Sequence, residues 1–275
     1  MKGPVKLLCS TVVLGLGLAV NTFALGHARY VETVNASGSF PLVAGKAAAA
    51  VYVDSGDYTG VVRAAGDLAA DVARVTGATP AMAHDDKGLG ASVVLAGTIG
   101  KSALIDRLIR EGKIDAGPIA GHWESFLIQV VARPLPGVAS ALVIAGSDKR
   151  GTIYGIYDLS EQIGVSPWYF WADVPVVHKD ALFVKAGIYG EGEPAVKYRG
   201  IFLNDEAPAL SGWVKEKYGT YNHQFYEKVF ELILRLKGNY LWPAMWDNAF
   251  NEDDPLNPRI ADEWGVVMGD RKSVV

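Results

Sequence analysis

Residues 199–242 decide the fold of this chain, and they read RGIFLNDEAPALSGWVKEKYGTYNHQFYEKVFELILRLKGNYLW. The pattern predicts a strand over 199–203, a long loop over 204–221, a helix over 223–237 and a second strand over 239–242. The helix carries one apolar stripe, made of Phe225, Val229, Leu232, Ile233 and Leu236. A strand, a helix and a strand in this order predict a right-handed crossover onto a parallel sheet.

The same alternation continues to the end of the chain. A short helix is predicted near 260–264, with Gly265 as its stop, and a third strand over 266–268. A parallel sheet needs cover on both faces, and three strands alone would make a poor domain. We therefore expect residues 195–269 to be the first strands and helices of an incomplete (β/α)8 barrel.

Residues 29–190 are expected to form a separate α/β accessory domain. Short apolar runs predict strands over 48–53, 92–96, 126–131 and 141–145, and helical spacing predicts helices over 58–75, 102–111 and 152–163. The stretch 187–194 contains three glycines and a proline and is predicted to be a linker. The predicted fold class is thus α/β, with this N-terminal domain preceding the barrel strands.

Both ends of the chain contain residues that are not expected to belong to the folded protein. Lys2 and Lys6 precede an apolar stretch over 7–20, and small residues allow cleavage after Ala24 or Ala28, so residues 1–28 are predicted to be a signal peptide. The alternative, a membrane anchor, is disfavoured because the run is shorter than a span of about 20 residues. A secreted or periplasmic protein without membrane contact is expected. Residues 270–275 match the translation of a common sequencing adapter, so we expect the natural protein to continue past Gly269.

Composition excludes several classes of function. The net charge is −4 and the basic residues are scattered, which disfavours nucleic acid as a partner. Cys9, the only cysteine, lies in the predicted signal, and the five histidines lack metal-ligand spacing. Residues 93–102 imitate a phosphate-binding loop with the wrong glycine spacing, and residues 252–254 are expected to be a solvated loop rather than a calcium site. No cofactor and no metal are predicted.

Carboxylates follow the first predicted barrel strand directly. Asn204, Asp205 and Glu206 stand where a (β/α) barrel carries its reacting groups. One interpretation is that they face a pocket, with Asp205 or Glu206 in acid, base or substrate-orienting work. The alternative, a helix cap or a solvated loop, fits the position equally well.

Tryptophans follow the second predicted strand. Trp242 and Trp246 flank a proline and stand beside Asp247 and Asn248. An aromatic plane suits the C–H face of a sugar ring, although a single tryptophan would more often belong to a core. We interpret Trp242, Trp246 and Asp247, together with Asn204, as substrate-binding residues.

Two other charged groups are weaker candidates. Residues 148–150, Asp-Lys-Arg, could reach the mouth of the barrel, or they could form a charged turn that caps the following helix, which is favoured. Arg199 could hold a substrate carboxylate, but its place at the start of a strand favours the opposite end of the sheet.

Long stretches of the chain resemble glycoside hydrolase family 115. The resemblance is carried by residues 197–206, 225–246 and 261–269 in the predicted barrel and by residues 121–126 and 146–157 upstream. It implies removal of α-1,2-linked glucuronic acid, or its 4-O-methyl ether, from glucuronoxylan or acidic xylo-oligosaccharides, with inversion at the anomeric carbon. Inversion needs two carboxyl groups about 6.5–9.5 Å apart, so Asp205 and Glu206 are not expected to be the whole pair.

The resemblance also implies that later barrel strands are missing. We therefore expect this chain to be an N-terminal fragment of a xylan α-glucuronidase that lacks activity by itself. Two alternatives stay open: a non-catalytic carbohydrate-binding protein and another exo-acting glycosidase.

Overall fold

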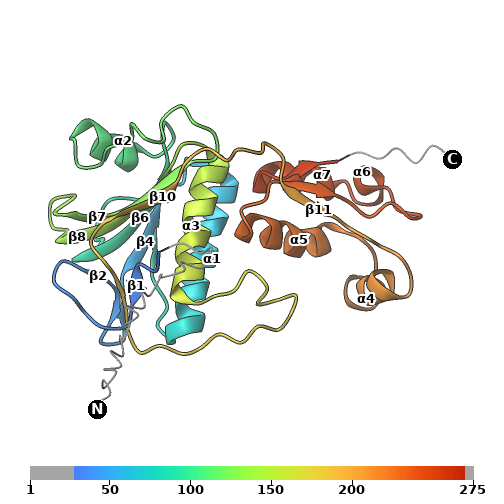
Figure 1. The fold of residues 1–275 in the computed structure, drawn as a ribbon, viewed down its shortest axis with the longest axis horizontal. Coiled ribbons are helices and arrows are strands. Elements are labelled where there is room, and N and C mark those ends of the chain that lie inside the picture. Colours follow the sequence, from blue (N-terminus) through green and yellow to red (C-terminus); the bar gives the residue numbers. More distant parts are fainter. Residues whose placement is uncertain (1–27, 270–275) are drawn as a thin grey trace, which may run out of the picture.

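The computed structural model describes residues 28–269, which form three β-sheets with helices packed around them. Figure 1 shows α1 and α3 in the middle of the molecule, between the sheets of the N-terminal part and the helices of the C-terminal part. Of the predicted signal peptide (residues 1–28), only Ala28 is among the described residues. The predicted adapter-encoded end (residues 270–275) lies outside them. Within residues 28–269, no helix has the length and hydrophobicity needed to cross a bilayer.

The largest sheet has six strands in the order β10-β7-β8-β6-β4-β5. β4 (Ala50–Val53), β6 (Ser92–Thr98), β8 (Ser140–Gly146) and the short β5 (Met82–Ala83) are parallel. β7 (Phe126–Ala132) and β10 (Ile188–Glu191) add an antiparallel edge. The central strands are buried on both faces, which explains their almost continuous apolar sequences.

Helices cover both faces of this sheet. α1 (Thr59–Thr76) and α3 (Lys149–Ile163) pack side by side on one face, and α2 (Ala103–Arg110) lies on the other (Figure 1). Asp148 caps the start of α3, and its carboxylate accepts a hydrogen bond from the N–H of Gly151. It ends at Gly164, where φ is 111°, a conformation that favours glycine.

A small antiparallel sheet joins the start and the end of the N-terminal part. It contains β1 (Val31–Glu32), β9 (Leu182–Val184), β2 (Phe40–Ala44) and β3 (Ala47–Ala48), in that order. Its apolar side chains belong to the same core as α1 and α3. The sequence did not predict these strands as a separate sheet, because they are short and come from both ends of the N-terminal part.

The third sheet has the predicted parallel crossovers. β11 (Gly200–Phe202), β12 (Tyr240–Trp242) and β13 (Val267–Met268) are parallel neighbours in that order. α5 (His223–Arg235) connects the first two strands, and α6 (Phe250–Asp253) and α7 (Leu256–Trp264) connect the next two. Ile201, Leu241 and Met268 lie in register and pack into the core, so helices cover one face of this sheet. The sheet does not close into a barrel within residues 28–269.

Two predictions about connecting segments are wrong. The predicted loop over 204–221 contains α4 (Ala209–Tyr218), whose only buried residue is Val214, so the sequence has no apolar stripe to reveal it. The predicted linker over 187–194 contains β10, which pairs with β7 at the edge of the large sheet. β10 has no buried residue and therefore gives no apolar run.

One hydrophobic core extends across the predicted domain boundary. α1 and α3 pack against the large sheet on one side and against α5 and α7 on the other. The approach is close: a Cβ atom on Gly60 of α1 would lie 2.4 Å from the carbonyl oxygen of Glu263 in α7. The predicted division at 190–195 thus begins within β10 and ends before β11, and one core is shared by the parts on either side of it.

Candidate active site at the strand ends

The carboxyl ends of β11 and β12 lie next to each other at one edge of the third sheet. Phe202 is opposite Trp242, and the N–H of Leu203 donates to the carbonyl oxygen of Trp242 at 2.9 Å. The segments that follow the two strands therefore leave the sheet side by side. In a (β/α) barrel this edge carries the polar groups that act on substrate.

Asp205 is the residue that connects these two segments. Its side chain is buried, with the residue only 1% exposed. One carboxylate oxygen, Oδ2, accepts hydrogen bonds from the N–H groups of Met245 (3.0 Å) and Trp246 (2.9 Å) and from Nδ2 of Asn248 (3.1 Å). The predicted carboxylate group and the predicted tryptophan segment are thus in direct contact.

The neighbours of Asp205 face solvent. Asn204 and Glu206 are both exposed, as expected when successive side chains of an extended segment point to opposite sides. The structure therefore separates the two carboxylates that the sequence placed together. Asp205 belongs to the protein interior, and Glu206 is accessible from outside.

The two tryptophans also differ in environment. Trp242 is half-buried, and its ring meets Phe202 edge-on with 5.5 Å between the ring centroids. Trp246 is 60% exposed, and it precedes Asp247, an exposed residue with a left-handed φ of 54°. Trp246 therefore presents a free aromatic surface at the strand ends, whereas Trp242 is part of a packed pair.

Ser211 and Tyr221, which the sequence did not predict as site residues, lie next to Asp205. The hydroxyl of Ser211, on α4, donates to the backbone carbonyl oxygen of Asp205 and lies 3.2 Å from the hydroxyl of Tyr221. Burial raises the pKa of Tyr221, and the nearby charge of Asp205 adds to this rise. Ser211 and Tyr221 carry no sequence signal of this role because both lie in the stretch 204–221, which was predicted to be a loop.

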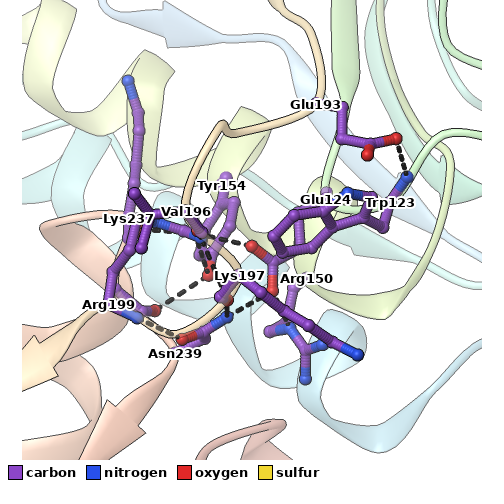
Figure 2. Close-up of polar contacts among 12 residues, drawn as sticks. Trp123, Glu124, Arg150, Tyr154, Glu193, Val196, Lys197, Arg199, Lys237 and Asn239 are labelled. Carbon is purple, nitrogen blue, oxygen red and sulfur yellow. Dashed lines mark hydrogen bonds and ion pairs between the residues drawn. The ribbon is translucent and has the colours of Figure 1, made fainter.

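A second polar cluster lies at the opposite, amino ends of the strands (Figure 2). Glu124 of the N-terminal part is buried, and it accepts hydrogen bonds from Nη2 of Arg199 (2.6 Å), from Nδ2 of Asn239 (2.7 Å) and from Nε of Arg150. Arg199 precedes β11 and Asn239 precedes β12. Arg199 and Asn204 thus lie at opposite ends of β11, which agrees with the predicted position of Arg199. Arg199 connects the N-terminal part to the third sheet.

The charged turn over 148–150 contacts the same amino ends and not the strand mouths. Nζ of Lys149 donates to the carbonyl oxygen of Asp262 at 2.7 Å, and Nη1 of Arg150 donates to that of Gly265 at 3.2 Å. Both acceptors precede β13. Asp148 caps α3, as favoured by the sequence, so the alternative of a substrate contact at the mouth is wrong for this turn.

Two carboxylates of the acidic run over 252–254 accept hydrogen bonds from nearby backbone N–H groups. Asp253 accepts from the N–H of Ala249, and Asp254 accepts from the N–H groups of His223 and Leu256. The hydrogen bonds from His223 lower the pKa of Asp254 to about 2. Among residues 28–269, no group of three or more His, Cys, Asp or Glu side chains could hold a metal ion.

Comparisons with known proteins show which family and which solved structures the chain is similar to. Residues 191–273 match the sequence model of glycosyl hydrolase family 115. The chain is similar to a solved family GH115 4-O-methyl-α-glucuronidase with specificity for decorated arabinogalactans, at 32% sequence identity and a TM-score of 0.70. The similarity covers 84% of this chain and 29% of that one, so the chain spans less than a third of its length.

More distant similarities are weaker. The structure of CpGH84D has 12% identity and a TM-score of 0.45, over 80% of this chain and 30% of that one. An N-acetyl-β-hexosaminidase from Streptomyces plicatus has 14% identity and a TM-score of 0.43, over 74% and 31%. A comparison with curated proteins gives no significant match.

Proposed function

Because this chain belongs to glycosyl hydrolase family 115, we propose that it supplies the N-terminal part and the opening barrel strands of an inverting α-glucuronidase. The enzyme removes α-1,2-linked glucuronic acid, or its 4-O-methyl ether, from a plant polysaccharide. The observation that supports this best is the convergence of Asp205 with the Trp246 segment at the carboxyl ends of β11 and β12.

The residues at the strand ends have different roles in this proposal. Glu206 is exposed and provides one of the two carboxyl groups that an inverting hydrolase needs about 6.5–9.5 Å apart. Trp246 offers its open aromatic face to a sugar ring, and Asn204 and Asp247 offer polar groups beside it. β11 and β13 have unpaired edges within the described residues, and further strands that pair there bring the second carboxyl group.

Two substrates are candidates. Glucuronoxylan and acidic xylo-oligosaccharides are the substrates that the family resemblance implies. Decorated arabinogalactans are the second candidate, because a 32% identical family member has specificity for them. Both are extracellular plant polymers, which agrees with a secreted or periplasmic enzyme and with the predicted signal peptide.

The test compares release of uronic acid from the two polymers. The protein, with and without the further barrel strands, is incubated with glucuronoxylan and with decorated arabinogalactan, and released 4-O-methylglucuronic acid is quantified by chromatography. We expect release only when the further strands are present, and proton NMR of the first product should show the anomer opposite to that of the substrate.

Other outcomes identify the alternatives. Binding of acidic oligosaccharides without release under any condition would favour a non-catalytic carbohydrate-binding protein. Release of sugar from chitin fragments, and none from either acidic polymer, would favour another exo-acting glycosidase. Retention of the anomeric configuration would contradict the proposed mechanism while leaving the substrate assignment intact.

A further inference from the structure

The hydrogen bonds of Asp205 leave little of its carboxylate for a substrate. Oδ2 accepts from three donors of the segment after β12, at 2.9–3.1 Å. The other oxygen, Oδ1, is buried and has no hydrogen-bond partner within the described residues. With the residue 1% exposed, neither oxygen is accessible to a sugar that approaches from solvent.

The backbone of Asp205 is held as firmly as its side chain. The hydroxyl of Ser211, on α4, donates to the carbonyl oxygen of Asp205. The backbone of Asp205 is therefore held by α4, while its side chain holds the segment after β12. The two consecutive N–H donors, of Met245 and Trp246, point at the same oxygen. A turn held by adjacent backbone donors on one anion has a defined conformation.

From these contacts we propose that Asp205 is a positioning residue, which holds the turn 243–248 and thereby fixes Trp246 at the carboxyl ends of β11 and β12, and that it does not exchange a proton with the substrate. This inference deepens the proposed function and rests on it for the identity of the sugar. The role of acid or base at this strand end is then left to Glu206, the exposed neighbour.

The hydrogen bonds from the turn 243–248 to Asp205 matter because the turn carries the exposed Trp246. Asn248 donates from Nδ2 both to Asp205 and to the carbonyl oxygen of Trp246, and Asp247 between them has a left-handed φ of 54°. A left-handed conformation at a residue other than glycine is unfavourable unless its surroundings enforce it. Without the carboxylate of Asp205, the turn loses three hydrogen bonds at once and the tryptophan loses its fixed position.

The first test follows the backbone directly and needs no substrate. Hydrogen exchange of the amides of Met245 and Trp246 is measured in the wild-type chain and in the variants Asp205→Ala, Asp205→Asn and Glu206→Gln. We expect Asp205→Ala to speed exchange at least tenfold, because the acceptor is gone. Asp205→Asn keeps an oxygen acceptor and should show a much smaller change, and Glu206→Gln should match wild type. Unchanged exchange in Asp205→Ala would overturn the proposal.

The second test separates positioning from proton transfer. Binding and release of a 4-O-methylglucuronosyl xylo-oligosaccharide are measured for the same four proteins, in the form with the further barrel strands, and circular dichroism verifies that each is folded. We expect Asp205→Ala to weaken binding or raise KM at least tenfold and Asp205→Asn to stay within about threefold of wild type. Glu206→Gln should lose turnover with unchanged exchange.

The outcomes distinguish this inference from the proposed function. Equal loss of turnover in Asp205→Asn and Asp205→Ala, with normal exchange in the asparagine variant, would show that the acid itself is needed and would overturn the positioning role. If wild type neither binds nor cleaves any acidic oligosaccharide, the proposed function fails, and the exchange results by themselves still decide whether Asp205 seats the turn.

Discussion

At the scale of the residue, Glu124 makes the most consequential contact outside the candidate site. Its buried carboxylate receives two arginines and an asparagine, and these come from three separate segments of the chain (Figure 2). Arg150 in turn reaches the carbonyl oxygen of Gly265. One side chain of the N-terminal part is thus connected to the segments that precede β11, β12 and β13.

Removal of this carboxylate should be costly. We expect Glu124→Ala to lower the free energy of unfolding by about 1.5–3 kcal/mol, because two half-buried arginines and Asn239 lose their hydrogen bonds to one buried carboxylate. Urea denaturation measures the change. Glu111→Ala is a matched control, since Glu111 pairs with Arg107 and Lys113 at the surface, where such pairs contribute little. Similar denaturation midpoints for the two variants would contradict the role given to Glu124.

The residue scale is also where sequence reasoning failed most. Asp205 and Glu206 are adjacent carboxylates in an identical local context, and the sequence assigned both to the same pocket. Only the folded chain brings the N–H groups of residues 245 and 246 to Asp205, about forty positions away, and so buries one acid while leaving the other exposed. Glu124 carried no signal for the same reason, because its partners come from distant segments.

At the scale of the element, the fit between α1 and α7 depends on a glycine. Gly60 of α1 approaches the carbonyl oxygen of Glu263 so closely that an added Cβ atom would lie 2.4 Å away. Gly66, on the same helix, has no atom within 4 Å of the place where its Cβ would be. The two glycines therefore stand in the same helix for different reasons.

Alanine at these two positions should have opposite effects. Gly60→Ala forces α1 and α7 apart and should destabilise the protein by about 1–3 kcal/mol. Gly66→Ala meets no neighbour and should stabilise it by about 0.5–1 kcal/mol, because alanine loses less backbone entropy in a helix. Thermal unfolding of both variants, followed by circular dichroism, measures the difference. Stabilisation by Gly60→Ala would show that this contact is not tight.

Helices and strands were predictable from the sequence where their burial produces a continuous or periodic apolar pattern. The apolar runs of β6, β7 and β8 and the stripe of α5 follow from one-sided or complete burial, and the sequence predicted all four. α4 and β10 have almost no buried residues, so nothing in their sequences marks them. The parallel direction of β11, β12 and β13 was predictable from the alternation of strands and helices, whereas their neighbouring order comes from the structure.

At the scale of the whole molecule, the described chain should unfold as one body. A buried ion pair, Arg235 with Asp71, and a partly buried one, Lys237 with Asp158, join α5 and the segment after it to the N-terminal part, both at 2.8 Å. The hydrophobic core is continuous across the same interface. A shared core and buried pairs make separate unfolding of either part unfavourable.

This predicts a single cooperative transition. Tryptophan fluorescence and far-ultraviolet circular dichroism should give coincident urea curves, because both report loss of the same core. Residues 28–191 produced alone should be less stable than the whole chain and bind a hydrophobic dye, since α1 and α3 lose the cover of α5 and α7. Two separated transitions in the whole chain would instead indicate an independent accessory domain.

The position of the Glu124 cluster has a consequence for how such a protein can diversify. The hydrogen bonds that join the two parts lie at the amino ends of the strands, and the loops of the candidate site leave from the carboxyl ends. Under the proposed function, mutations that change the choice of polysaccharide can therefore accumulate in these loops while the contacts at the opposite ends keep the fold intact, so new specificities can evolve at little cost to stability.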